Sequence, residues 1–396
     1  MTPQHANTAQ NDDSDAWAER GDYWQKKLNP VPQYKARKRR VIHRPLVLSG
    51  HGIRLNVDYG TLVIKCGFTH YPQSREEYRF FPRDRQLPSR IVILDGDGSI
   101  TFDALEWMSV QGVPLVQINW RGEVSSIGGA DYAANPDLVK RQLELRDNGE
   151  GFEFSKWLIS NKIENSYETI KRISGNSPEA QLILQKIDAQ SVALKKNPPV
   201  NFSSLLTVEG IAAAAYFRYW YTLSLNWKGI GKKPIPQEWL RIGTRIGPNH
   251  SNQFALHPVN AILNYAYGVL ENQVRGQILA VGVDPTIGYM HSTLEKGRPS
   301  LVFDLMEPVR PVMDLKILEF VLKHKFSPGD FILNKQGICS LHPQFARYIV
   351  KLIQDIPEIE TITAANIKRL FSGHINSKNP RKANNSPSLQ LIKSPK

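Results

Sequence analysis

The stretch IRLNVDYGTLVIKCG, from Ile53 to Gly67, alternates apolar and polar residues and thereby predicts a β-hairpin. Leu55 and Val57 lie on one face of its first strand, and Gly60 stands where the chain has to turn. A second hairpin is predicted for SRIVILDGDGSITF, Ser89–Phe102, in which two apolar runs flank an Asp-Gly repeat. A short helix and the strand PLVQINW follow, so antiparallel β-structure with one small helix is the simplest assembly of this region.

After about Pro136 the apolar residues recur three or four positions apart, which is the spacing of helices. Ser177 and Pro178 are typical of an N-cap and a first helical position. We therefore predict an α+β protein in which an N-terminal antiparallel β domain precedes a larger all-helical domain. Helices are expected in LVKRQLELR, FSKWLISNKIENSYETIKRI and SPEAQLILQKIDAQSVALKK. Further helices are expected at residues 205–225, 257–281, 312–325 and 343–354. The expected divisions are a flexible extension at 1–40, a β domain at 41–130, a helical domain at 131–358 and a disordered tail at 359–396.

The positive charge of the chain is concentrated at its ends. The 396 residues include 50 Lys and Arg against 37 Asp and Glu, a net charge of +13. Residues 1–40 hold eight basic and five acidic residues, and residues 361–396 hold seven basic residues and no acid. Both ends are polar and lack an apolar period, so we expect them to be loosely ordered. They are either solvated tails or electrostatic arms that bind a polyanion such as DNA.

Several classes of protein are excluded by composition. Cys66 and Cys339 are the two cysteines of the chain, too few for a disulfide framework or a four-cysteine zinc module. No apolar run is long enough to span a membrane, and the polar N-terminus does not resemble a signal peptide. We therefore expect a cytoplasmic protein with no membrane contact.

Three segments of the helical region carry candidate chemistry: TVEGIAAAAYF with Glu209, DPTIGYMHS with His291, and SLVFDLMEPVRP with Asp304 and Glu307. Each residue alone also has a structural explanation: a glutamate at a helix start, a packed or surface histidine, and a surface ion pair with Arg310. Together, two carboxylates and a neutral imidazole make a mixed site suited to magnesium or manganese, completed by water and substrate phosphate.

The sequence DGDGSITFDALE resembles a calcium-binding loop, but it carries Ile100 where the sharp turn of that loop requires glycine.

The helical segments closely resemble the CRISPR-associated spacer-acquisition integrase family, from about Pro45 to about Val350. The match rests on EGIAAAAYF, HPVNAILNYAYGVL, GVDPTIGYMHS and GRPSLVFDLMEPVRP, in this order along the chain. The resemblance implies a β domain joined to a helical catalytic domain. It also implies transesterification, in which a DNA 3′-hydroxyl attacks a target phosphodiester, with metal-dependent nuclease activity.

The resemblance further implies metal ligands at Glu209, His291 and Glu307, with Asp304 in a supporting catalytic role. Tyr216, which shares a helix face with Glu209, and Arg310 are expected to support the site or to contact DNA. Arg241 and Arg245, in the loop RIGPNHSNQFALHP, are expected DNA contacts, although this loop carries fewer arginines than is usual in the family. The implied partners are double-stranded DNA, a second copy of the chain and a small second adaptation subunit.

Two other interpretations stay open at the level of sequence. One keeps the chemistry but assigns the protein to a transposon-borne, casposase-like or array-independent integrase. The other is a DNA-binding scaffold without catalysis. Both basic ends lie outside the resemblance.

Overall fold

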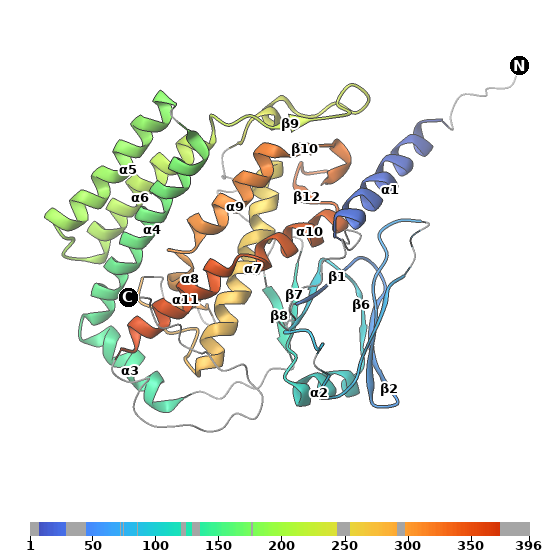
Figure 1. Ribbon diagram of the computed structural model, residues 1–396, viewed down its shortest axis with the longest axis horizontal. Coiled ribbons are helices and arrows are strands. Elements are labelled where there is room, and N and C mark those ends of the chain that lie inside the picture. The colour runs from blue at the N-terminus through green and yellow to red at the C-terminus, as the bar shows by residue number, and fades with distance from the viewer. Residues whose placement is uncertain are drawn as a thin grey trace, which may run out of the picture.

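The computed structural model describes residues 8–28, 45–71, 73, 75–84, 86–119, 124–128, 135–175, 177–243, 254–290 and 298–372. Figure 1 shows a β-rich N-terminal region beside a larger region of long helices. This is the predicted α+β class with the predicted order along the chain.

Two four-stranded sheets form the N-terminal region. One has the order β4-β3-β2-β6 and the other has the order β1-β5-β7-β8. The strands of the first are β2 (Ile53–Asp58), β3 (Thr61–Lys65), β4 (Glu77–Phe80) and β6 (Gly98–Ile100). Those of the second are β1 (Leu46–Ser49), β5 (Ile91–Leu94), β7 (Leu115–Ile118) and β8 (Val124–Gly128). The hairpin predicted around Gly60 is confirmed, because β2 and β3 pair antiparallel with Asp58 opposite Thr61.

The prediction of a purely antiparallel region is only partly correct. β5 pairs parallel with both β1 and β7, and β6 pairs parallel with β2. The second predicted hairpin is therefore wrong, since the runs before and after the Asp-Gly repeat belong to different sheets. A tight turn signal does not reveal whether the chain folds back or crosses to another sheet. Asp95, with a φ of 41°, begins that crossing.

The helical region begins at Pro136, as predicted. Its helices are α3 (Pro136–Asp147), α4 (Glu150–Ser174), α5 (Pro178–Lys196), α6 (Phe202–Trp220), α7 (Pro258–Val281), α8 (Ser300–Met306), α9 (Arg310–Lys323), α10 (Pro343–Gln354) and α11 (Pro357–Leu370). The region is not all-helical, because it also contains the short strands β9 (Asn226–Trp227), β10 (Lys325–Phe326), β11 (Phe331–Leu333) and β12 (Cys339–Leu341). A further helix, α2 (Phe102–Gln111), belongs to the β region.

Helix α7 lies between the other long helices and the strands β7 and β8 (Figure 1). It is buried on nearly every side and packs against α8, α9, α10 and α11. Its ends follow from local sequence: the His257 side chain accepts a hydrogen bond from the Val259 amide, and Gly282 ends the helix with a φ of 82°. The first half of α7 is buried on almost all sides and therefore has to be covered by other elements. Among these are α8 and α9, which flank Glu307.

The expectation of a flexible segment at residues 1–40 is wrong for residues 8–28, which form α1 (Thr8–Leu28). This helix packs on α10, and its Trp24 is fully buried and stacks on Phe345. Arg20 forms a buried, two-pronged ion pair with Asp330. The sequence pattern did not predict this helix, because its first half is polar and only a few residues of its second half are buried against the protein, among them Trp24. The tail prediction is likewise wrong for residues 359–370, which complete α11.

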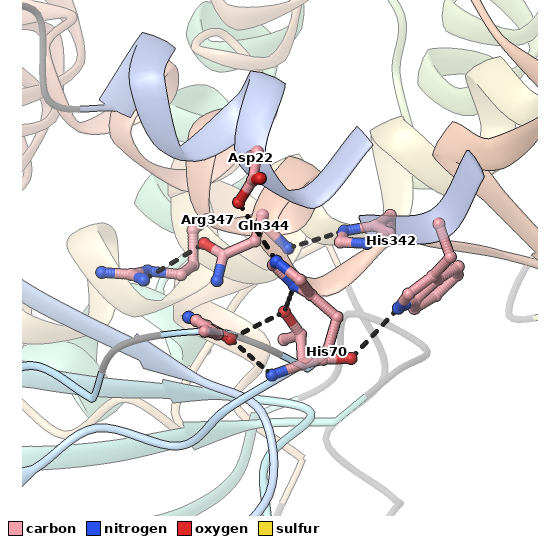
Figure 2. Close-up of polar contacts among 8 residues, drawn as sticks. Asp22, His70, His342, Gln344 and Arg347 are labelled. Carbon is pink, nitrogen blue, oxygen red and sulfur yellow. Dashed lines mark hydrogen bonds and ion pairs between the residues drawn. The ribbon is translucent and has the colours of Figure 1, made fainter. Parts of the chain in front are cut away.

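Helix α1 also connects the two regions of the molecule (Figure 2). His70, in the loop after β3, forms a hydrogen-bonded pair with Asp22 of α1, 3.1 Å between Nε2 and Oδ1. The Trp17 indole of α1 donates to the Thr69 carbonyl at 3.0 Å, and its ring packs at a tilt against His342, the N-cap of α10. Helix α1 is thus held at the junction between the β loop and the helical region.

Within the part of the chain that the structure describes, every helix is too short or too polar to cross a bilayer.

Candidate active site

Glu209 lies well inside α6, not at its start as the sequence suggested. The helix begins at Phe202, where Asn201 and Ser204 form a reciprocal capping box. The interpretation of Glu209 as a glutamate favoured by a helix start is therefore wrong. Buried Ala212 and Ala215, on the next turns, allow close packing of α6 against α4 and α5, so the Glu209 side chain is left only 19% exposed.

Glu307 directly follows α8 and is almost completely buried. Its backbone is helical, with φ −53° and ψ −51°, even though Pro308 comes next. A proline disfavours helical geometry in the residue before it, yet here the break in the helix lies between Met306 and Arg310, where α9 begins. Burial also excludes the surface ion pair that was the alternative explanation for this segment.

Helix α4 brings this turn alongside α6. Asn165 donates a hydrogen bond to the Pro308 carbonyl at 2.7 Å, and Thr169 donates to the Pro311 carbonyl at 2.8 Å. Residues 162, 165 and 169 share one face of α4 because of their spacing. The sequence pattern did not predict this polar face, because its signal is limited to a few polar side chains among the apolar positions of an amphipathic helix.

The two glutamates meet at the ammonium group of Lys162. Its Nζ contacts Glu209 Oε1 and lies 2.5 Å from Glu307 Oε2. The other oxygen of Glu307, Oε1, is 2.9 Å from Nη1 of Arg310. The structure therefore brings together Glu209, Glu307 and Arg310, three of the residues that the sequence selected, and adds Lys162.

The two carboxylates of Glu209 and Glu307 stabilise a positive charge placed between them. Burial acts to lower the pKa of Lys162, but Glu307 and Glu209 outweigh it and hold that pKa above its ordinary value. The ammonium thus remains charged between two carboxylates. Convergence of two hard oxygen donors on one cation is also the arrangement that a magnesium or manganese ion requires.

Asp304 is fully buried on α8 and faces the segment before His291. Its Oδ2 accepts hydrogen bonds from the backbone amides of Tyr289 and Met290, at 2.5 and 3.1 Å. The carboxylate thus holds the chain at the position from which residue 291 continues. His291 itself lies outside the described residues, as does Arg245.

Tyr216 lies beneath the acids and is buried. Its hydroxyl donates to Asp314 Oδ2 at 3.1 Å, and Tyr267 donates to the other oxygen at 2.8 Å. Burial and Asp314 raise the pKa of Tyr216 well above its ordinary value. Direct DNA contact by Tyr216 is therefore not supported, because its polar group is occupied inside the protein.

A cavity of about 60 Å³ lies next to the acid pair. It is lined by residues of α4, α6, α7 and α9, among them Lys162, Glu209, Tyr216 and Arg310. The guanidinium of Arg310 also lies 5.4 Å from the centre of the Tyr267 ring, which holds it in place. Arg241 lies on a different segment. It is exposed there, and its backbone forms an antiparallel β-bridge with that of Ser224.

Among the described residues, no three His, Cys, Asp or Glu side chains converge closely enough to hold a metal ion on their own. Two of the three expected ligands, Glu209 and Glu307, do converge. The third, His291, follows the segment that Asp304 holds. The donor chemistry present therefore fits a divalent ion, with the described residues supplying the two carboxylates.

Comparisons with known proteins place the chain among characterised relatives. Residues 46–355 match the family described as CRISPR associated protein Cas1. A CRISPR-associated endonuclease Cas1 from Pyrobaculum aerophilum is 28% identical over 278 residues, which cover 69% of this chain and 80% of the relative.

Two solved structures share the fold. A casposase bound to its integration product has a TM-score of 0.66 at 22% identity, over 89% of this chain and 96% of the other. A chain of a Cas6-RT-Cas1–Cas2 complex has a TM-score of 0.65 at 16% identity, over 86% of this chain and 36% of the other.

Proposed function

Because this chain belongs to the family of CRISPR-associated Cas1 proteins, we propose that it is a metal-dependent DNA integrase and endonuclease. In this proposal it joins a DNA 3′-hydroxyl to a target phosphodiester, as in the insertion of new spacers into a CRISPR array. The observation that carries the proposal is the meeting of Glu209 and Glu307 at one cation, beside Arg310 and a cavity.

Glu209, Glu307 and His291 would hold a magnesium or manganese ion. When bound, such an ion polarises a phosphoryl oxygen and favours ionisation of the attacking hydroxyl. The protein supplies the positions of the ligands. Arg310 orients one oxygen of Glu307, and the turns around Pro308 and Pro311 are fixed by α4. Asp304 holds the backbone that leads to His291.

The proposed partners are double-stranded DNA, a second copy of the chain and a small second adaptation subunit, in the cytoplasm. Support for the subunit comes from the shared fold with a chain of a Cas6-RT-Cas1–Cas2 complex. A casposase-like or array-independent integrase is the alternative with the same chemistry, and the casposase also shares the fold. The presence of a repeat array and a second-subunit gene near the coding sequence separates these two assignments.

The proposal is tested by strand joining with a 3′-hydroxyl duplex and plasmids with and without candidate repeats, followed by sequencing of the junctions. Glu209→Ala and His291→Ala are expected to abolish joining under magnesium or manganese while the protein stays folded. Glu168→Ala is the matched control, because Glu168 is exposed on α4 and forms a surface ion pair with Lys171. Undiminished joining by either site variant would overturn the assignment.

The non-catalytic scaffold makes a different prediction for metal binding. Calorimetry that finds no manganese affinity in the wild type, and therefore none to lose in Glu307→Ala, would favour the scaffold over the enzyme.

A further inference from the structure

Lys162 is the residue of the site that the sequence did not suggest. Its ammonium contacts one oxygen of each of two proposed metal ligands, Glu209 and Glu307, and only 17% of its side chain is exposed. It reaches this position from α4, the helix that also fixes the Pro308 and Pro311 carbonyls. The contact is therefore built into the packing of α4 against α6 and the α8–α9 turn.

The charges of the site explain why a cation is needed there. Two carboxylates this close together repel each other, and burial strengthens that repulsion. Lys162 and Arg310 supply two positive charges against the two negative ones. Without a cation between them, the acids would have to separate or take up a proton.

The two cations differ in how firmly they are held. Arg310 is planar, contacts the oxygen of Glu307 that faces away from Lys162, and lies over the Tyr267 ring. Lys162 is a point charge on a flexible stem that borders the cavity of about 60 Å³. Lys162 is therefore the cation that can withdraw from the acid pair, and the cavity gives its side chain space to do so.

We propose that Lys162 is the internal counter-ion of the acid pair and that a divalent ion binds by exchange with its ammonium. This inference rests on the proposed function, because it takes Glu209 and Glu307 as metal ligands. Lys162 keeps the two carboxylates close together before the ion arrives, and it sets the metal concentration at which the site fills. Lys162 is thus a positioning residue that acts through the two glutamates.

The test is calorimetric titration of the full-length protein with manganese. Lys162→Met removes the competing charge, so manganese is expected to bind about tenfold more tightly than to the wild type, a difference of about 1.4 kcal/mol. Lys171→Met is the matched control, because Lys171 lies on the same helix, is 60% exposed and pairs with Glu168. Its affinity for manganese is expected to equal that of the wild type.

Thermal unfolding supplies a readout that a merely structural lysine would not produce. Lys162→Met is expected to have a lower melting temperature than the wild type without metal, and saturating manganese is expected to remove most of the difference. A lysine that only stabilises the fold would lower the melting temperature equally with and without manganese. If Lys162→Met does not fold, Lys162→Gln carries the same expectations, since its amide still donates to a carboxylate.

Unchanged or weaker manganese affinity in the folded variants, while the wild type binds manganese and joins DNA, would overturn this inference and leave the proposed function intact. No manganese binding by the wild type would overturn both.

Discussion

Two buried charge clusters in this protein differ in how their carboxylates are held by neighbouring groups. In one, Asp330 accepts hydrogen bonds from Arg20 Nε and Nη2, from the Trp24 indole and from the Ser327 amide, at 2.6 to 2.9 Å. In the other, Glu209 and Glu307 share the single ammonium of Lys162. The first cluster fastens α1 to the helical region, and the second lies beside a cavity.

The difference lies in how each carboxylate is satisfied. Asp330 is held by planar or backbone donors in one geometry, so its cluster has no easy way to exchange a partner. The acid pair is held by a flexible lysine and one arginine, so a partner can be exchanged with little rearrangement. Burial of charge thus serves rigidity in one cluster and ligand exchange in the other.

The largest expected effect comes from removing one charge of the acid pair. Glu307→Gln keeps the size of the side chain but supplies a weaker metal ligand, so strand joining is expected to fall below about 1% of the wild-type rate. Measured joining rates and circular dichroism check this prediction. A variant that joins DNA normally would show that Glu307 only supports the fold.

The opposite result is expected at Asp330. Asp330→Ala leaves Arg20 buried without its partner, which is expected to lower the free energy of unfolding by about 3–5 kcal/mol, while joining per folded molecule is retained. Urea denaturation measures the effect. Glu77→Ala is the control, because the Glu77–Arg79 pair is exposed and is expected to contribute about 0–1 kcal/mol. Equal losses in both variants would show that the buried Arg20–Asp330 pair stabilises the fold no more than an exposed pair does.

Stability is expected to fall as the solution becomes acidic, because α10 begins with a buried histidine. Burial lowers the pKa of His342 to about 3, whereas an unfolded chain has a value of about 6.5. Below pH 6.5 the unfolded chain takes up the proton first, so stability that is complete above about pH 6.5 is lost as pH falls toward 3. Each pH unit in this window costs about 1.4 kcal/mol for one such histidine.

Urea denaturation between pH 7.5 and pH 5 measures this loss in the wild type and in His342→Asn. Asparagine keeps an N-cap acceptor for the Gln344 amide, which His342 Nδ1 now provides, but it does not titrate. The slope of stability against pH is therefore expected to be smaller in the variant. Equal slopes would mean that His342 is protonated in the folded protein.

The smallest expected effect concerns the basic end of the chain. Deletion of residues 373–396, which hold five Lys and Arg and no acid, is expected to reduce the salt dependence of DNA binding without changing manganese affinity. The deletion starts after α11, which has to stay because buried Ile367 and Leu370 pack into the core. Binding measured at several salt concentrations checks this, and an unchanged slope would show that the tail does not contact DNA.

Much of the fold was predictable because its signals are local. The β2–β3 hairpin follows from alternation around Gly60, and α5 follows from Ser177 and Pro178. The separation of β5 and β6 into two sheets was not predictable, since it depends on pairing with distant strands. Helix α1 was also missed, because a few anchoring residues, Trp24 among them, fix a segment whose composition is otherwise polar.

The sequence by itself determined the order of the two regions, the segments that match the family, and the residues Glu209 and Glu307 as candidates for one site. Only the tertiary structure decided that a lysine from a third helix stands between them, and that Asp304 holds the backbone before His291. The physical reason is that electrostatic contacts act through space. A lone lysine within an amphipathic helix is typical of a solvated face, and the packing of α4 against α6 and α8 makes this one the partner of two buried acids.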